Sequence, residues 1–268
     1  MKSKNVFNGI NYYFNDLKKH NALVLIHGNS LDSTIFTKQF EGLKNIPLVA
    51  IDLPGHGLSN RANNFESAYC LPGYIDAVKS IIDHLELDNI ILAGHSLGGH
   101  VAIEAANEMN SVQGMMIFGT PPIGMPPQMD KMFDPNPAMG NLFSPEISEE
   151  NAKLLAKEFV YNSKELESKY ATMISATDGN ARENLGASIG KGQFKNEIEI
   201  VAKSKMPIAV LNGEQDAFVN KAYINGLIVG NLWNGQKIWI KDAGHIPQEE
   251  KPQEFNSIVM KFYDHVFT

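Results

Sequence analysis

An apolar run of strand-forming residues leads through a glycine-rich turn into a helical pattern between Ile90 and Met109. The apolar run ends at Gly94, and the sequence Gly-His-Ser-Leu-Gly occupies positions 94–98. A serine on a sharp strand-to-helix turn has a strained backbone, and it needs neighbours without side chains because strand and helix approach closely there. The pattern therefore predicts that Ser96 projects from such a turn, as a nucleophilic serine does.

Apolar runs of strand length alternate with helical patterns along most of the chain. Continuous apolar runs are typical of strands buried on both faces of a parallel sheet. The dipeptide Asn8-Gly9, inside the loosely alternating stretch 5–14, predicts an antiparallel hairpin at the sheet edge. We therefore expect an α/β fold with a mostly parallel central sheet flanked by helices. The expected strands are 22–26, 47–51, 89–93, 114–119, 207–211 and 237–240, and the expected helices include 35–43, 74–85, 101–109, 223–229 and 255–266.

The alternation stops after Gly119. A segment rich in Pro and Met follows, then helical patterns at 149–161 and 164–176, with no further strand until about Pro207. About eighty residues between two strands is far longer than an ordinary connection. We therefore expect residues 1–120 and 201–268 to form the core and residues 121–200 to form a helical cap inserted between two core strands.

Charge and composition narrow the classes of partner. The net charge of -7 argues against nucleic acid, which normally requires a basic face. The longest apolar runs are much shorter than the ~20 residues of a membrane span, and residues 1–19 lack the apolar centre of a secretory signal. Cys70 is the only cysteine, which excludes an internal disulfide. We expect a cytoplasmic protein that acts on a small molecule, with neither nucleic acid nor membrane as partner; nothing indicates the oligomeric state.

A serine hydroxyl becomes a strong nucleophile when a base takes its proton and a third group orients that base. In parallel α/β sheets these groups gather in loops at the carboxyl ends of the strands. His245 follows the last expected strand, and Asp216 follows the strand that ends at Leu211. We predict that His245 is the base and that Asp216 is the acid that orients it. Glu214 is the rival acid, with an exposed loop charge as its alternative role.

Two backbone N–H groups are candidates for stabilising a developing oxyanion. The N–H of Leu97 lies at the start of the helix after Ser96, where backbone donors are unpaired and the helix dipole is positive. We assign the second donor to the backbone N–H of Asn29, because its loop follows the strand 22–26 and should lie beside the serine turn. A turn residue tolerant of unusual φ is the alternative role of Asn29.

The sequence has no cluster of Cys and His and no His-x-x-x-His helix, so we predict neither a metal nor a cofactor. Asp52 precedes the loop 54–59, and we expect it to bond that loop's backbone rather than act as an acid.

Methionines gather around the strand before the inserted segment and within that segment. Gap-filling in the core is one explanation, and a pliable apolar pocket for an acyl chain is the other. The residues concerned are Met115, Met116, Met125, Met129, Met132, Met139 and Met173.

Across almost its whole length the chain resembles the α/β-hydrolase superfamily, through positions 27–29, 52–59, 94–99, 216 and 245. More narrowly, it is similar to the metal-independent N-acylhomoserine lactonases of this fold at positions 119–122, 177–179 with Arg182, 207–219, 230–233 and 242–255. The resemblance implies a lactonase in which Ser96, Asp216 and His245 are nucleophile, acid and base. The acid at position 216 is Asp in this sequence, whereas lactonases of this kind also use Glu in the same role. The likeness thins between positions 123 and 170, and Tyr161 and Tyr170 are the candidates for a cap tyrosine that contacts the lactone.

The function predicted from these features is a serine hydrolase that opens the lactone ring of N-acylhomoserine lactones through an acyl-enzyme, a quorum-quenching activity. A carboxylesterase or a carbon–carbon bond hydrolase on a small apolar substrate is the alternative, because the cap rather than the triad selects the substrate. A noncatalytic module that binds a small apolar signal is a third possibility, and the complete set of Ser96, Asp216 and His245 argues against it.

Overall fold

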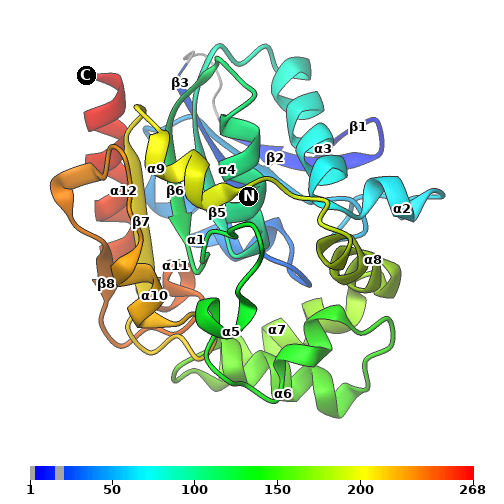
Figure 1. Ribbon diagram of the computed structural model, residues 1–268. Helices are drawn as coiled ribbons and strands as arrows, with labels where there is room; N and C mark the ends of the chain where they lie inside the picture. Colours follow the sequence, from blue (N-terminus) through cyan, green and yellow to red (C-terminus); the bar gives the residue numbers. More distant parts are fainter. Residues whose placement is uncertain (1–3, 16–20) are drawn as a thin grey trace.

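The computed structural model describes residues 4–15 and 21–268, and part of the N-terminal stretch on which the expected location rests lies outside these residues. The described residues form one eight-stranded sheet in the order β1-β2-β4-β3-β5-β6-β7-β8 (Figure 1). Its strands are β1 Lys4–Phe7, β2 Ile10–Phe14, β3 Asn21–Ile26, β4 Leu48–Ile51, β5 Asn89–His95, β6 Val112–Phe118, β7 Ile208–Gly213 and β8 Ile238–Ile240.

The edge hairpin is confirmed. β1 and β2 are antiparallel with Phe7 opposite Ile10, and the two turn residues Asn8 and Gly9 have φ of 49° and 80°. Positive φ at both turn positions matches the right-handed twist of the flanking strands and explains the choice of Asn-Gly. β2 also pairs antiparallel with β4, and every later pairing is parallel.

Alternate residues of each central strand pack on opposite faces of the sheet. In β3, Val24 contributes to one core cluster and Leu25 to the other. The first cluster is covered by α3 and α4, and the second by α1 and α12 together with buried side chains of α6 and α7. The helices are α1 Thr37–Gly42, α2 Phe65–Ala68, α3 Leu71–His84, α4 Leu97–Ala106, α5 Met129–Met132, α6 Glu149–Phe159, α7 Lys164–Ala176, α8 Gly179–Gly190, α9 Glu197–Lys203, α10 Lys221–Gly226, α11 Pro247–Glu250 and α12 Pro252–Phe267. No described helix is both long and apolar enough to cross a bilayer.

The segment between β6 and β7 holds helices α5 to α9 and supplies no strand to the sheet. In Figure 1, α5, α6, α7 and α8 lie together in the lower part of the molecule, whereas α9 packs against α4. This arrangement supports our proposal that residues 121–200 form a cap on a core of 1–120 and 201–268. The sequence patterns did not predict α8 or α9, since α8 carries glycine at both ends and in its middle and α9 is only seven residues long.

Asp52 acts within its loop, as expected. Its carboxylate accepts hydrogen bonds from the backbone N–H groups of Ser33 at 2.8 Å and Leu58 at 2.9 Å, and from Asn11 Nδ2 at 2.8 Å. Asp52 is buried, and these bonds tie the loop after β4 to the loop after β3.

Candidate active site

Ser96 occupies a strained turn between β5 and α4. Its backbone has φ 50° and ψ -117°, which is unfavourable for a residue with a side chain. A Cβ on Gly94 would lie 2.1 Å from the carbonyl oxygen of Gly98, and a Cβ on Gly98 would lie 2.2 Å from that of Ile26. The two glycines are therefore required by close backbone approach. The predicted strand-to-helix turn is confirmed, although α4 begins at Leu97 rather than Val101, because the turn itself forms its first residues.

Hydrogen bonds hold this turn to the neighbouring strand. The N–H of Ser96 donates to the carbonyl oxygen of Phe118 at 2.9 Å, and the hydroxyl of Thr120 donates to the carbonyl oxygen of Ser96 at 3.0 Å. A turn fixed at both its N–H and its C=O can keep an unfavourable φ, since the surrounding structure over-determines it.

The structure brings His245 and Asp216 together. Nδ1 of His245 lies 2.8 Å from Oδ2 of Asp216, and the two side chains are only 5% and 1% exposed. The other carboxylate oxygen of Asp216 accepts the backbone N–H groups of Phe218 at 2.8 Å and Val219 at 3.1 Å. These donors fix the orientation of the carboxylate. Because Oδ2 of Asp216 accepts the hydrogen bond from Nδ1, the pairing selects the His245 tautomer that has its proton on Nδ1.

The loops that carry these two residues approach closely because of Gly213. A Cβ at this position would lie 1.9 Å from the carbonyl oxygen of Gly244. Glu214, the rival acid, instead forms an ion pair with Lys221 at 3.1 Å, and its side chain is 35% exposed. Glu214 is therefore an exposed charge in this loop, which is the alternative role considered for it from the sequence.

The His245 ring lies in an aromatic setting. Its centroid is 5.4 Å from that of Phe159, 5.3 Å from that of Phe218 and 4.8 Å from that of His95. His95 is fully buried, and its Nε2 donates to the carbonyl oxygen of His245 at 2.8 Å. Burial, and then the neighbouring His245, hold the pKa of His95 well below its usual range. His95 is therefore neutral, and its hydrogen bond supports the His245 loop.

The inserted segment also fastens the His245 loop. The N–H of His245 donates to the carbonyl oxygen of Phe159 at 3.0 Å. The carboxylate of Glu250 accepts the N–H groups of Gly244 at 2.6 Å and Tyr161 at 2.8 Å. The position of the imidazole therefore depends on contacts between the sheet loop and the end of α6.

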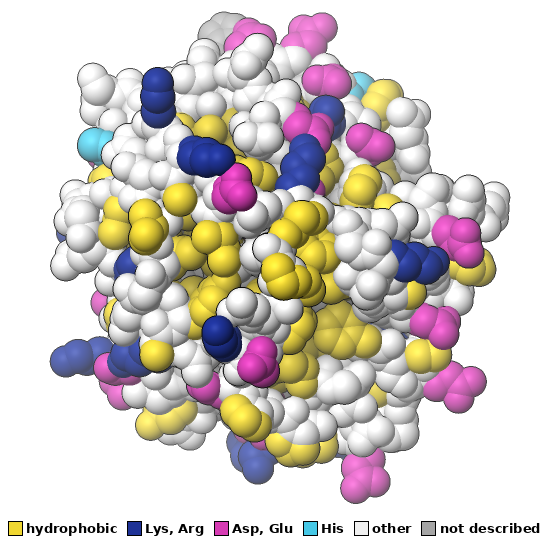
Figure 2. All heavy atoms as spheres, viewed as in Figure 1, with side chains coloured by type: hydrophobic (Ala, Val, Ile, Leu, Met, Phe, Trp, Pro, Cys, Tyr) yellow, Lys and Arg dark blue, Asp and Glu magenta, His cyan; other side chains and the backbone are white. Residues whose placement is uncertain are grey.

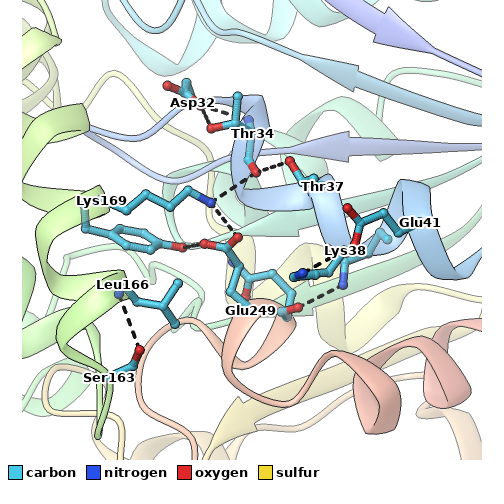
Figure 3. A network of polar contacts seen from close by, with 12 residues as sticks. Asp32, Thr34, Thr37, Lys38, Glu41, Ser163, Leu166, Lys169 and Glu249 are labelled. Carbon is cyan, nitrogen blue, oxygen red and sulfur yellow. Dashed lines mark hydrogen bonds and ion pairs between the residues drawn. The ribbon is translucent and has the colours of Figure 1, made fainter. Parts of the chain in front are cut away.

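A second link joins α7 to both sides of the site (Figure 3). Lys169 Nζ lies 2.5 Å from Oε1 of Glu249 and donates to the carbonyl oxygen of Thr34 at 3.4 Å. Glu249 belongs to α11, shortly after His245, and Thr34 follows the Asn29 loop. One lysine thus connects the inserted segment with α11 and with the turn that follows the Asn29 loop.

Neither tyrosine considered as a lactone contact lines the cavity beside Ser96. Tyr170 is fully buried, and its hydroxyl donates to Oε2 of Glu249 at 2.9 Å. Burial, reinforced by Glu249, raises the pKa of Tyr170 well above its usual value. Tyr161 is half exposed, on the outer surface near Glu250.

The Asn29 loop lies beside the serine, as predicted. A Cβ on Gly28 would lie only 3.0 Å from Cβ of Ser96, so the loop can approach because Gly28 has no side chain. Within the described ranges, the backbone N–H groups of Asn29 and Leu97 donate to no backbone acceptor. The amide side chain of Asn29 donates to the carbonyl oxygen of Leu142 at 2.6 Å. The left-handed residue in this turn is Ser30, with φ 62°, rather than Asn29.

A cavity of about 70 Å³ lies between the serine turn and the inserted segment. Most of its lining is apolar, and methionines of α5 contribute two of its side chains, whereas Met115 and Met116 lie in the sheet core. Figure 2 shows hydrophobic side chains gathered over the middle of this face, between the positions of α5 and α8. Met115 and Met116 therefore fill the core, whereas Met129 and Met132 line the cavity, and the binding of an acyl chain there stays a prediction. The lining consists of Asn29, Ser96, Leu97, His100, Ile123, Met129, Met132, Phe133, Leu142, Phe143, Leu185 and Ile189.

The cavity lining contains neither Lys nor Arg. Arg182 belongs to α8, whose residues Leu185 and Ile189 line the cavity, but its own side chain is buried. Its guanidinium donates hydrogen bonds to backbone carbonyl oxygens. It donates to those of Ser144 at 2.7 Å and Ile174 at 3.0 Å, with longer bonds to Thr177 and Pro145. Arg182 is therefore a structural clamp between α7, α8 and the residues before α6. Among residues 4–15 and 21–268, no group of three or more His, Cys, Asp or Glu side chains is arranged to hold a metal ion.

The chain belongs to the alpha/beta hydrolase family, whose model matches residues 23–258. The sheet order, the serine turn and the paired His245 and Asp216 are consistent with that membership.

Among solved structures, the chain is similar to a variant of the N-acyl homoserine lactonase AidH complexed with N-hexanoyl homoserine lactone. The TM-score is 0.90 and the identity 31%, over 97% of this chain and 96% of that one. AidH complexed with N-butanoyl homoserine gives a TM-score of 0.89 and an identity of 33%, over 94% and 92% of the two chains. Among curated proteins, an Escherichia coli 2-hydroxy-6-oxononadienedioate/2-hydroxy-6-oxononatrienedioate hydrolase is 28% identical over 93% of this chain and 90% of its own length.

Proposed function

We propose that this protein is a serine hydrolase that opens the lactone ring of N-acylhomoserine lactones, with Ser96 as nucleophile, His245 as base and Asp216 as its orienting acid. Such an activity would inactivate acylated lactone signals and so quench quorum sensing. The observation that carries the proposal is the likeness to lactonase structures over nearly the full chain, at 31% identity, in a protein whose serine turn opens on an apolar cavity.

The proposed reaction begins when Ser96 Oγ attacks the ring carbonyl carbon and Nε2 of His245 takes the hydroxyl proton. The backbone N–H groups of Leu97 and Asn29 stabilise the oxyanion, each such donor being worth on the order of 3 kcal/mol. Collapse of the tetrahedral intermediate breaks the bond between the carbonyl carbon and the ring oxygen, and His245 returns its proton to that oxygen. Water then cleaves the acyl-enzyme, with His245 as base, and releases the N-acylhomoserine.

The leaving alcohol in this reaction stays attached to the acyl group, because the ring oxygen and the carbonyl belong to the same molecule. It can close the ring again unless water attacks first. The cavity should therefore shield the acyl chain in its apolar part and admit water on the His245 side.

The alternative suggested by the Escherichia coli relative is hydrolysis of a carbon–carbon bond. A dioate carries two carboxylates, and a buried carboxylate is costly without a cationic partner. The cavity lining offers neither Lys nor Arg, and the guanidinium of Arg182 is already bonded to backbone carbonyls. The apolar lining therefore favours an uncharged acyl substrate, which leaves a carboxylesterase as the nearer rival.

The test is a comparison of initial rates on three substrates: N-hexanoylhomoserine lactone, a linear hexanoate ester of the same acyl length, and 2-hydroxy-6-oxononadienedioate. We expect the lactone to have the highest kcat/KM. Rapid cleavage of the ester without lactone opening would make the protein an esterase, and turnover of the dioate alone would make it a carbon–carbon hydrolase. Failure of a fluorophosphonate to label Ser96 would instead favour a noncatalytic binding module.

A further inference from the structure

His100 lines the cavity one helical turn after Ser96, and the reaction proposed above gives it no task. Ser96 and His100 line the same cavity, and the backbone N–H of His100 donates to the carbonyl oxygen of Ser96 at 3.4 Å. A group on His100 can therefore reach the part of a bound substrate next to the carbonyl that Ser96 attacks.

A buried carboxylate from another part of the chain fixes the ring of His100. Nδ1 of His100 lies 2.8 Å from Oε2 of Glu197, and the two side chains are 12% and 0% exposed. The same oxygen accepts the N–H of Ile123 at 2.8 Å, and the N–H of Glu197 donates to the carbonyl oxygen of Ile123 at 2.8 Å. Glu197 thus joins α9, the start of the inserted segment and the cavity wall.

This arrangement determines what the free edge of the ring offers. Oε2 of Glu197 accepts a hydrogen bond from Nδ1–H of His100, and in this tautomer of the uncharged ring Nε2 carries a lone pair and no proton. Nε2 is then a hydrogen-bond acceptor at the edge of a mostly apolar cavity. Such a group recognises a donor on the ligand, because a buried acceptor without a donor is costly.

We propose that His100, positioned by Glu197, accepts the amide N–H of an N-acylated lactone and so distinguishes it from lactones that lack this N–H. The inference rests on the proposed lactonase function and deepens it. The amide nitrogen is bonded to the ring carbon next to the attacked carbonyl, and it carries the only N–H of the substrate. His100 is thus a specificity residue, and Glu197 is a positioning residue that acts through it.

The experiment compares kcat/KM for opening N-hexanoylhomoserine lactone and the isosteric analogue in which CH₂ replaces the amide N–H. For the unaltered protein we expect a preference of about tenfold for the amide, the size of a net hydrogen bond. His100→Phe keeps a ring of similar size without an acceptor, and the ratio should fall close to one. His100→Gln puts an amide oxygen near the position of Nε2 and should restore part of the preference.

Variants of α9 test the role of Glu197. Glu197→Leu should lower the ratio as His100→Phe does, whereas Glu197→Gln keeps an acceptor for Nδ1 and should retain most of it. Glu199→Gln, an exposed position on the same helix that pairs with Lys203, is the matched control and should leave the ratio as it was. Thermal melting of each variant identifies any that fails to fold.

The outcomes separate the two proposals. An unchanged ratio in His100→Phe, whatever the absolute rates, would overturn the role of His100, as would an unaltered protein without preference. Loss of opening of both lactones in His100→Phe and His100→Gln, in folded protein, would also overturn it, because a general role in the reaction would then explain the residue. If the unaltered protein opens neither lactone, the proposed function itself fails.

Discussion

The side chain of His95 donates a 2.8 Å hydrogen bond from Nε2 to the backbone carbonyl oxygen of His245. His95 is the residue immediately before Ser96, so the end of β5 that presents the proposed nucleophile also supports the loop of the proposed base. The bond is buried, and the low pKa that burial gives His95 keeps its imidazole uncharged beside His245. The His245 loop is thus held to the end of β5 by a contact within the core.

Replacing the proposed nucleophile or base should remove nearly all hydrolysis. We expect Ser96→Ala and His245→Ala each to lower kcat by about 10⁴-fold or more with the fold intact, and the double variant to lose little beyond either single one, because triad members act as a unit. Steady-state rates together with circular dichroism check this. Substantial turnover by Ser96→Ala would rule out the covalent route.

The two acids of the loop after β7 should differ sharply. Asp216→Asn removes the carboxylate that orients His245 and stabilises its cation, and we expect a loss of about 10⁴-fold in kcat. Glu214→Gln is the matched control in the same loop, and it breaks only an exposed ion pair with Lys221, worth about 0–1 kcal/mol. A larger effect of Glu214→Gln than of Asp216→Asn on kcat would make the assignment of the acid wrong.

Activity should survive exhaustive chelation. The reaction proposed for Ser96, His245 and Asp216 needs no metal-bound water, and the described residues contain no group suited to hold an ion. Rates before and after dialysis against EDTA should agree. Loss of activity on dialysis and its return with a divalent ion would contradict this prediction.

Glu104 of α4 should make stability depend on pH. Burial raises its pKa to about 7, although the N–H of Lys195 donates to its carboxylate at 2.9 Å. The folded state therefore holds this proton more tightly than the unfolded state, and stability falls as pH rises from the ordinary value of 4.5 to about 7. Glu104→Gln keeps the acceptor and removes the charge, so we expect a higher Tm than that of the unaltered protein at pH 8 and a similar Tm at pH 4.

Glu108 is the control for this measurement because its pKa is shifted the other way. Hydrogen bonds from Lys195 and Lys79 lower it, so its stabilising effect is present at neutral pH and lost as pH falls. Glu108→Gln should therefore lower Tm slightly at pH 8. Equal Tm changes for Glu104→Gln at the two pH values would mean that Glu104 does not titrate in this range.

Much of this fold was predictable because its signals are local. Continuous apolar runs marked the parallel strands, Asn8-Gly9 marked the hairpin, and the glycines around Ser96 marked the turn that the structure contains. The positions of Asp216 and His245 followed from a rule of topology, since loops after parallel strands meet at one edge of the sheet.

The parts that escaped prediction depend on distant contacts. His100 and Glu197 are 97 positions apart, and nothing near either residue in the sequence indicates the other. Tyr170 was a candidate for contact with the lactone and instead bonds Glu249, because the packing of α7 turns it into the protein interior. Packing of the inserted segment, rather than its helical pattern, decides which of its side chains face the cavity.

Mass spectrometry of the product from N-hexanoylhomoserine lactone tests the central claim most directly, with Ser96→Ala as the parallel sample. We predict one product, heavier than the substrate by one water with the hexanoyl chain retained, formed by the unaltered protein and absent with Ser96→Ala. Free hexanoate with homoserine lactone would show amide cleavage instead, and an unchanged substrate alongside rapid hydrolysis of a linear hexanoate ester would contradict the lactonase account.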